Sequence, residues 1–326
     1  MDESYPIMTP SEYFKAILHF WERETFMTVC ELCGSSRIRV LKSARREPLL
    51  LVHFCLDCRL LQNGSPLGPT RLEGNQFQDY LNAQDEIFEL TRRQGVLQEL
   101  VQQLGSTSLP LAVYDVGAGS GAFLALAKER GFSVSGNELS SSSINLIDET
   151  FGFKIEKGNF EEKNYVSELE AVTLFCVLAH SVSPSNLLES IHKSLRPGGV
   201  CYLHTPRLCL IDLVGIFGFI ISKGKLDQLL FRRVGGDHRR IYSRKAMKMI
   251  LQQAGFQNFK INALIGYGLK KEKYFESLGL SLGVSKILGN TVQVLSIINL
   301  LPRNVFEIYA YKPKWVVRDS NPRPRH

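Results

Sequence analysis

The chain has 326 residues, of which 44% are hydrophobic and 22% are charged, and it includes seven cysteines. This composition is typical of a folded globular protein and excludes a disordered or collagen-like chain. Lys and Arg outnumber Asp and Glu by 39 to 32, for a net charge of +7. An excess of this size is compatible with anionic substrates or an anionic lipid surface but does not indicate nucleic-acid binding by itself.

The N-terminal region predicts a helix rather than a targeting signal. It begins MDESYPIMTP, which is acidic and lacks an apolar core, so we expect no secretory signal and a cytoplasmic protein. Residues 11–27 repeat apolar positions at helical spacing, and we treat 1–27 as an N-terminal helix.

Two C-x-x-C pairs, CELC at 30–33 and CLDC at 55–58, define a small module over residues 28–65. Each pair presents two thiolates from one tight turn, and two pairs complete a closed tetrahedral site of the structural zinc type. We predict that structural Zn²⁺ is bound by Cys30, Cys33, Cys55 and Cys58. Structural or redox thiols are the alternative. His53 lies near the second pair, but the four cysteines already fill the coordination shell.

Residues 66–105 predict a helical linker, and residues 106–314 predict the main domain. In that domain, short apolar runs that predict strands occur at 111–116, 132–138, 153–159, 171–178, 200–206, 257–265 and 305–312. Helical patterns between them occur at 120–131, 141–152, 184–199 and 243–256. Such alternation predicts an α/β fold with a Rossmann-like, seven-stranded, mostly parallel sheet and helices on both faces.

The first strand of that domain runs into a glycine-rich loop, DVGAGSG at 115–121. Its glycines also satisfy the looser dinucleotide fingerprint, so they fit either a pyrophosphate or S-adenosylmethionine. Glu138 ends the second strand, where an acid accepts hydrogen bonds from the ribose of either cofactor. Asp115 separates the two cofactors better, because a carboxylate inside the turn repels a pyrophosphate and attracts the ammonium of a methionine.

Motifs further along the domain resemble the class I S-adenosylmethionine-dependent methyltransferases over about residues 109–260 and, more loosely, the last strand. Besides DVGAGSG, they are GNELS (136–140), GNF (158–160), VTLFCVLAHSVSP (172–184), LRPGG (195–199), HTP (204–206) and AGF (254–256). Together they favour a methyltransferase over a dinucleotide-binding protein.

The resemblance implies a binding role for several residues. The glycine loop would pass under the methionine part of S-adenosylmethionine, with Asp115 at its base, and Glu138 would hold both ribose hydroxyls. Asn159, where the family often has Asp, would reach the adenine amino group, and the Phe160 backbone would meet the edge of the ring. The cofactor-binding residues expected from this resemblance are Asp115, Gly117, Gly119, Gly121, Glu138, Asn159 and Phe160.

The segment after the fourth strand resembles the one that faces the transferred methyl group in this family, and it ends in His180. We expect His180 to act as the catalytic base, with a wall or helix-capping role as the alternative. The Asn/Asp-Pro-Pro-Tyr motif of enzymes that methylate exocyclic amines and the Pro-Cys nucleophile of cytosine C5 methyltransferases are both absent from the sequence. We therefore expect no DNA substrate, and RNA is disfavoured.

A zinc module that precedes a class I domain with Ala-His after the fourth strand resembles bacterial sugar and natural-product methyltransferases. The resemblance implies a small-molecule acceptor, such as a sugar or glycan precursor, in polysaccharide biosynthesis. Tyr80 and Arg92 or Arg93 could contact cofactor or substrate, or form a solvated helix face. The alternatives kept open are an RNA methyltransferase whose zinc module grips RNA and a non-catalytic, cofactor-binding scaffold.

Residues 208–241 form an insertion in the main domain, apolar at first and then basic. Its apolar stretch, 208–221, is too short for a comfortable membrane span and carries Asp212. The basic residues are Lys223, Lys225, Arg232, Arg233, Arg239 and Arg240. Such a segment could be a substrate lid, which we prefer, an interfacial helix on the inner face of an anionic membrane, or a dimer contact. His238 and Tyr242 are expected to line or close the pocket.

The chain ends in RDSNPRPRH, the product expected from a reading frame that runs antisense through the T-arm of a tRNA gene. We expect the fold to end near Lys314 and residues 315–326 to be a non-native or disordered tail.

Overall fold

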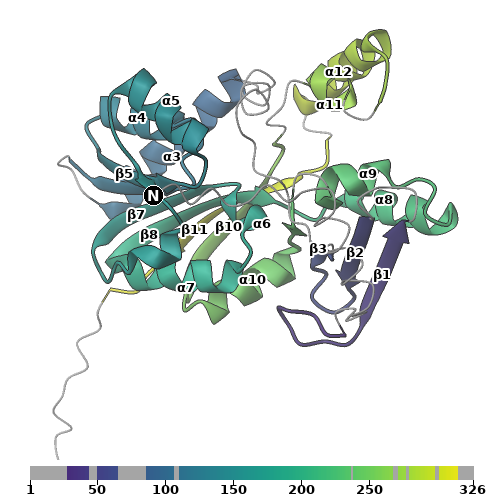
Figure 1. Cartoon of the computed structure of the whole chain (residues 1–326), viewed down its shortest axis with the longest axis horizontal. Helices are drawn as coiled ribbons and strands as arrows, with labels where there is room; N and C mark the ends of the chain where they lie inside the picture. Colours follow the sequence, from purple (N-terminus) through teal and green to yellow (C-terminus); the bar gives the residue numbers. More distant parts are fainter. Residues whose placement is uncertain are drawn as a thin grey trace, which may run out of the picture.

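The computed structural model describes residues 28–43, 50–64, 86–105, 110–235, 238–266, 271–276, 279–297 and 301–314. The predicted N-terminal helix, the tail after Lys314 and most of the linker that precedes residue 86, including Tyr80, lie outside these ranges. A seven-stranded sheet between two layers of helices makes up the larger part of the described chain (Figure 1).

The central sheet has the strand order β10-β11-β8-β7-β4-β5-β6. Its strands are β4 (Ala112–Val116), β5 (Ser133–Glu138), β6 (Glu156–Lys157), β7 (Leu169–Phe175), β8 (Leu195–Pro206), β10 (Asn258–Leu264) and β11 (Val305–Tyr311). Strand β11 runs antiparallel to both of its neighbours, β10 and β8. The other neighbouring strands of the sheet pair in parallel. The Rossmann-like, mostly parallel sheet predicted from the sequence is confirmed.

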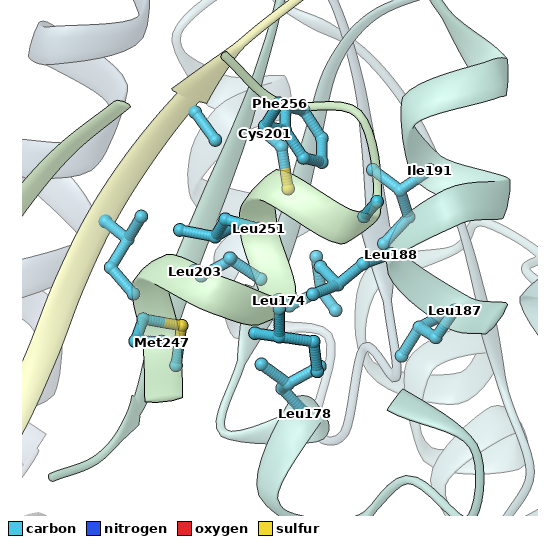
Figure 2. Close-up of a cluster of buried hydrophobic side chains, with 14 of the residues drawn as sticks. Leu174, Leu178, Leu187, Leu188, Ile191, Cys201, Leu203, Met247, Leu251 and Phe256 are labelled. Atoms are coloured by element: carbon cyan, nitrogen blue, oxygen red, sulfur yellow. The ribbon is translucent and has the colours of Figure 1, made fainter. Parts of the chain in front are cut away.

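Helices cover both faces of this sheet. One layer consists of α3 (Glu86–Leu104), α4 (Ala122–Glu129) and α5 (Ser141–Phe151). The other contains α7 (Pro184–Ser194) and α10 (Arg244–Gln253). A short helix α6 (Val177–His180) follows β7, and a 3₁₀ turn (Phe160–Lys163) follows β6. Figure 2 shows part of the core between α7, α10 and the sheet, where Leu188, Ile191, Leu203, Met247 and Leu251 meet.

Local sequence explains where several of these helices start and stop. Ser140 and Ser243 are N-caps whose side chains accept the backbone N–H of Ser143 and Ala246. Pro184 occupies the first turn of α7, where its missing N–H costs nothing. Gly152 ends α5 in the left-handed region at φ 65°, which a glycine adopts without a steric penalty.

The elements of the main domain differ from the sequence-based expectation in several places, and the strand predicted at 171–178 ends at Phe175, before α6 begins. The strand predicted at 153–159 shrinks to two residues, because Gly158 turns the chain and Phe160 turns inward. The LRPGG segment belongs to β8 instead of ending the preceding helix. Two helices, α11 (Lys271–Glu276) and α12 (Leu282–Ile297), lie where no element was predicted, and α12 extends away from the sheet in Figure 1.

The N-terminal module supplies three strands of a second, four-stranded antiparallel sheet. The strands of this sheet are β1 (Ile38–Ser43), β2 (Leu50–Cys55), β3 (Leu61–Asn63) and β9 (Arg240–Ile241). The fourth strand comes from the end of the insertion and pairs Leu61 with Ile241. The insertion also supplies α8 (Leu210–Ile221), α9 (Gln228–Leu230) and a π-helical turn (Phe231–Gly235). The module and the insertion are therefore one folded unit.

That unit has its own small core and is also joined to the main domain. Leu41, Val52 and Leu61 of the module pack against the helical part of the insertion, among them Ile216 and Phe219 of α8. On the other side, Cys30, Leu32 and Leu60 belong to the same buried cluster as Tyr242 and Ile250. Side chains of Ser243, Lys245 and Gln253 donate hydrogen bonds to backbone carbonyls of Cys58, Asp57 and Leu32.

Asp212, the charge within the apolar stretch, is fully buried in α8. Its carboxylate accepts the backbone N–H of Cys209 at 2.8 Å and is bound by the Arg233 guanidinium at 2.7 Å. Arg240 is likewise paired with Glu31. Two of the six basic residues in the insertion therefore serve in internal ion pairs, which leaves them unsuited to binding a polyanion. Among the described residues, no helix is long and apolar enough to cross a membrane.

Candidate active site

The predicted cofactor loop lies at the carboxyl end of β4. A side chain on Gly117 would come within 2.7 Å of Val177, and one on Gly121 within 2.6 Å of Ile147, so both glycines are required for packing. A side chain on Gly119 would meet nothing within 4 Å. The middle of the loop is therefore bare on its outer side, and its open space is where a ligand can approach the backbone closely.

Glu138 turns back onto this loop from the end of β5. Its carboxylate accepts the Gly119 N–H at 2.9 Å, and also the N–H groups of Leu139 at 2.6 Å and Ser140 at 3.0 Å. Strands β4 and β5 lie so close together here that a side chain on Gly136 would come within 2.7 Å of the Asp115 carbonyl oxygen. The structure thus brings the predicted ribose acid and the predicted methionine loop together at one edge of the sheet.

Asp115 lies at the end of β4 with 2% of its surface exposed. Its carboxylate accepts a hydrogen bond from the Thr173 hydroxyl at 2.6 Å, across the β4–β7 pair. Burial raises the pKa of Asp115 to about 7, although the Thr173 hydrogen bond opposes this shift. The structure places this acid under the loop, where it links two strands.

Asn159 and Phe160 follow β6 at the same edge of the sheet. Asn159 begins the 3₁₀ turn, and its side-chain amide donates to Glu162 at 2.7 Å. The Phe160 ring is buried and packs edge-on against Tyr114, with the ring centroids 5.2 Å apart. The ring anchors the turn, which leaves the Asn159 side chain on the surface.

His180 meets two other potential ligands at the carboxyl end of β7. The Cys176 Sγ atom lies 3.8 Å from His180 Nε2 and 3.4 Å from His238 Nε2. The two imidazole rings are 4.9 Å apart. His180 keeps exposed surface, and desolvation by the surrounding atoms, followed by the charge of Arg239, lowers its pKa. Tyr242, which we also expected at the pocket, is instead fully buried in the core.

A buried polar network adjoins this edge from the other side. Arg92 of α3 hydrogen-bonds His204 of β8 at 2.8 Å between Nη1 and Nε2, and it also pairs with Glu89. Its guanidinium lies over the Phe175 ring, 5.2 Å from the centroid. Arg93 lies 3.5 Å from Glu89. Arg92 is therefore part of an organised network rather than of a solvated helix face.

The four module cysteines converge as the spacing predicts. The Sγ atoms of Cys30 and Cys58, and those of Cys33 and Cys55, are each 3.6 Å apart, and all four lie within 4.8 Å of one another. Ligands at about 2.3 Å from a tetrahedral ion are about 3.8 Å apart, so the group has the right size for one. His53 is outside this cluster.

Cys176, Glu89 and His204 were not predicted as site residues from the sequence, and the contact of His238 with His180 was not predicted either. Cys176 precedes His180 by four residues, one helical turn, and that spacing was a usable signal. His238 is 58 residues from His180 and Glu89 is 115 residues from His204, so their contacts depend on the sheet topology. No local pattern would have found them.

A family model described as a methyltransferase domain matches residues 90–261, more than half of the chain. No curated protein matches the sequence at a significant level. A SAM-dependent methyltransferase from Archaeoglobus fulgidus has a TM-score of 0.42 at 19% identity, covering 68% of this chain and 94% of that one. Phosphoethanolamine N-methyltransferase 2 from Haemonchus contortus, solved with S-adenosyl-L-methionine, has a TM-score of 0.44 at 15% identity, covering 68% of this chain and 53% of that one.

The matched range contains the glycine loop, Glu138, the segment that ends in His180, and the LRPGG, HTP and AGF motifs. It also includes the central-sheet strands from β4 to β8 in full and the first part of β10, and it ends before β11. The chain belongs to the methyltransferase-domain family and is a class I S-adenosylmethionine-dependent methyltransferase.

Proposed function

We propose that this methyltransferase acts on a small molecule, a sugar or a glycan or natural-product precursor. The observation that carries the proposal is the position of the module–insertion unit. Its strand β9 and His238 are joined to the carboxyl edge of the main sheet through the Arg239 N–H, which donates to the Ala179 carbonyl at 2.8 Å. A unit fixed at that edge can enclose an acceptor of limited size, whereas a broad basic surface would suit RNA.

The residues that would hold the cofactor are those around the bare middle of the glycine loop. When bound, S-adenosylmethionine supplies a methyl group activated by a sulfonium. Glu138 would accept from the ribose hydroxyls, and the Gly119 backbone would border the methionine part. Asn159 would reach the adenine from the next strand. His180 would face the acceptor, because Val177 on the same short helix touches Gly117.

We further propose that the four-cysteine cluster holds a structural zinc ion. The fit rests on four thiol groups whose sulfur atoms all lie within 4.8 Å of one another, a group of suitable size for a tetrahedral ion. The hydrogen bond with Cys58 lowers the pKa of the Cys30 thiol and raises that of Cys58, so one thiolate of this pair is favoured even without a cation. Four thiolate ligands leave no open position, so this metal would support folding and not catalysis.

For the insertion, we propose that the outer face of α8 rests on an anionic lipid surface. The exposed residues of that face are Leu210, Leu213, Val214, Phe217, Ile220 and Ile221. Lys223 and Lys225 follow directly and are exposed. Apolar side chains flanked by lysines suit the boundary between headgroups and acyl chains. The opposite end of the insertion, at His238, would serve the lid role expected from the sequence.

The function is tested by cofactor binding and by methyl transfer. We expect calorimetry to detect S-adenosylmethionine binding to the full chain and expect Gly119→Arg and Glu138→Ala to abolish or sharply weaken it. Gly152→Arg is the control for Gly119→Arg, since Gly152 also has positive φ and open space but lies away from the loop. Glu170→Ala is the control for Glu138→Ala, because Glu170 accepts a backbone N–H at the opposite edge of the sheet.

Labelled S-adenosylmethionine is then offered with a panel of nucleotide sugars and with tRNA. We expect label in a sugar acceptor and none with the Gly119→Arg protein. Salt-dependent tRNA binding with transfer to tRNA would support the RNA methyltransferase instead. Binding of S-adenosylmethionine without methyl transfer to any acceptor of the panel would support the non-catalytic, cofactor-binding scaffold.

A further inference from the structure

Cys176, His180 and His238, hereafter the CHH cluster, bring three potential metal ligands together away from the four module cysteines. Their ligand atoms all lie within 4.8 Å of one another. They come from two distant parts of the chain, since Cys176 is the N-cap of α6 and His180 its last residue, while His238 belongs to the insertion. Apart from the module cysteines, no other such group of His, Cys, Asp or Glu occurs among the described residues.

The spacing in the CHH cluster suits one tetrahedral ion. A sulfur at about 2.3 Å and a nitrogen at about 2.0 Å from such an ion are about 3.5 Å apart. The two sulfur–nitrogen distances in the cluster are 3.4 Å and 3.8 Å. Small side-chain rotations would therefore bring all three atoms within bonding distance of a common centre.

The His238 ring is held in the orientation that a metal ligand needs. Its Nδ1 lies 3.1 Å from the Arg233 carbonyl oxygen, to which it donates as Nδ1–H, so Nε2 directs its lone pair toward Cys176. Ligating histidines commonly donate their second nitrogen to a carbonyl in this way. The Arg233 side chain is itself fixed by the buried Asp212. The orientation is thus supported by two further residues.

The backbone at Cys176 is also unusual. This residue caps α6 at φ 68°, in the left-handed region that a non-glycine residue rarely adopts. Its N–H donates to the His204 carbonyl at 2.8 Å, which helps to hold that conformation. Strained backbone of this kind collects at functional sites, because the surrounding structure must stabilise it. Here the conformation places the thiol one helical turn before His180.

The cluster borders the cofactor loop. Cys176 precedes Val177, whose side chain lies against Gly117. The two loops follow β4 and β7, which are adjacent parallel strands. The CHH cluster therefore lies beside the place where the family delivers its methyl group, and His180 keeps exposed surface there.

We propose that Cys176, His180 and His238 form a second metal site, selective for Zn²⁺, with an open fourth position for an oxygen ligand. One thiolate and two imidazoles are ligands typical of zinc, and three protein ligands with one open position are typical of catalytic zinc. The metal site stands on the cluster itself. The identity of the oxygen ligand rests on the proposed function: it is a hydroxyl group of the acceptor. His180 then acts as a metal ligand and not as a free base.

The test is the metal content of the full chain. We expect elemental analysis after dialysis, followed by calorimetric titration with Zn²⁺, to give two binding sites per chain in the wild-type protein. Cys176→Ser, His180→Ala and His238→Ala should each lose one equivalent and keep the other. Cys209→Ser is the control, because this cysteine lies outside both clusters at the N-cap of α8, where serine is well tolerated.

Replacement by Co²⁺ gives a second readout. We expect the Cys176→Ser protein to lose part of the thiolate-to-cobalt absorption, while the bands of the four-cysteine site remain. Binding of S-adenosylmethionine, measured on the same variants, shows whether they are folded and separates this proposal from the proposed function. Equal zinc content and equal cobalt spectra in the wild-type and Cys176→Ser proteins would overturn the second site and leave a metal-free thiol–imidazole cluster.

Discussion

Asp115 illustrates how the tertiary structure changes the chemistry of a single side chain in the loop. The sequence places a carboxylate in the turn, and a carboxylate there is readily understood as a partner for an ammonium group. In the fold it is buried under the loop and accepts the Thr173 hydroxyl, and burial raises its pKa to about 7. Its contribution to the strand pairing is therefore coupled to its protonation.

Stability should reflect this coupling. Because the pKa of Asp115 is raised in the folded state from 3.8 to about 7, the folded protein holds a proton that the unfolded chain has lost between these values. The free energy of unfolding should fall as pH rises through that window. Asp115→Asn should remove this contribution, so its stability relative to wild type should rise by roughly 2–3 kcal/mol between pH 5 and pH 8.

Guanidinium denaturation of both proteins at the two pH values measures the difference. Titrations elsewhere in the chain affect both proteins equally and cancel. An unchanged difference between pH 5 and pH 8 would show that Asp115 ionises at the same pH in the folded and unfolded chains.

Helix α8 has a buried face and an exposed face. In the sequence both faces belong to the single apolar stretch 208–221, which does not distinguish them. One face packs on the module sheet through Ile216 and Phe219, and the buried Asp212 pairs with Arg233. The other face is exposed and apolar, and Phe217 and Ile221 are each 65% exposed. Exposed apolar surface of this extent on one helix indicates an interaction surface.

We expect the full chain to float with vesicles of phosphatidylcholine mixed with phosphatidylglycerol, less so at high salt. The double substitution Phe217→Asp and Ile221→Asp should leave the protein in the soluble fraction, because charges are costly in the apolar layer. Val166→Asp is the matched control, since Val166 is 67% exposed and lies outside the insertion. Wild-type protein that never floats but sediments as a dimer would assign the face to a second copy of the chain.

At the scale of the whole molecule, the N-terminal module is not an independent domain, because it makes extensive contacts with the insertion and the main domain. Its sheet is completed by β9, Glu31 pairs with Arg240, and its cysteines lie in the main buried cluster. A unit of this small size cannot build a large core by itself, so it depends on such contacts and on metal. Loss of the metal should therefore affect the whole protein.

We expect one cooperative transition in scanning calorimetry of the zinc-loaded protein. Cys33→Ser should lower its midpoint by roughly 5 °C or more, since the metal no longer stabilises the folded state. Cys33 is only half-buried, so its replacement disturbs packing little, and Cys209→Ser again serves as the control. Two separate transitions, with the main one unchanged by Cys33→Ser, would contradict this coupling.

Much of the fold was readable from the sequence because its signals are local. Alternating apolar runs and capped helices predicted most of the central sheet, and the C-x-x-C pairs predicted the cysteine cluster that the structure contains. Helices α11 and α12 were missed. The exposed, apolar residues of α12, such as Leu282 and Ile287, give a poorly amphipathic pattern.

The glycine loop with Glu138, the succession of strands and helices along the chain and the module cysteines follow from short-range patterns, since turn geometry and periodicity depend on neighbouring residues. The pairing of β3 with β9, the Asp212–Arg233 ion pair and the CHH cluster were decided only in three dimensions. In each case the partners come from segments that meet only after the sheets have formed. Chain separation hides such contacts from any local pattern, and the topology of the two sheets brings them together.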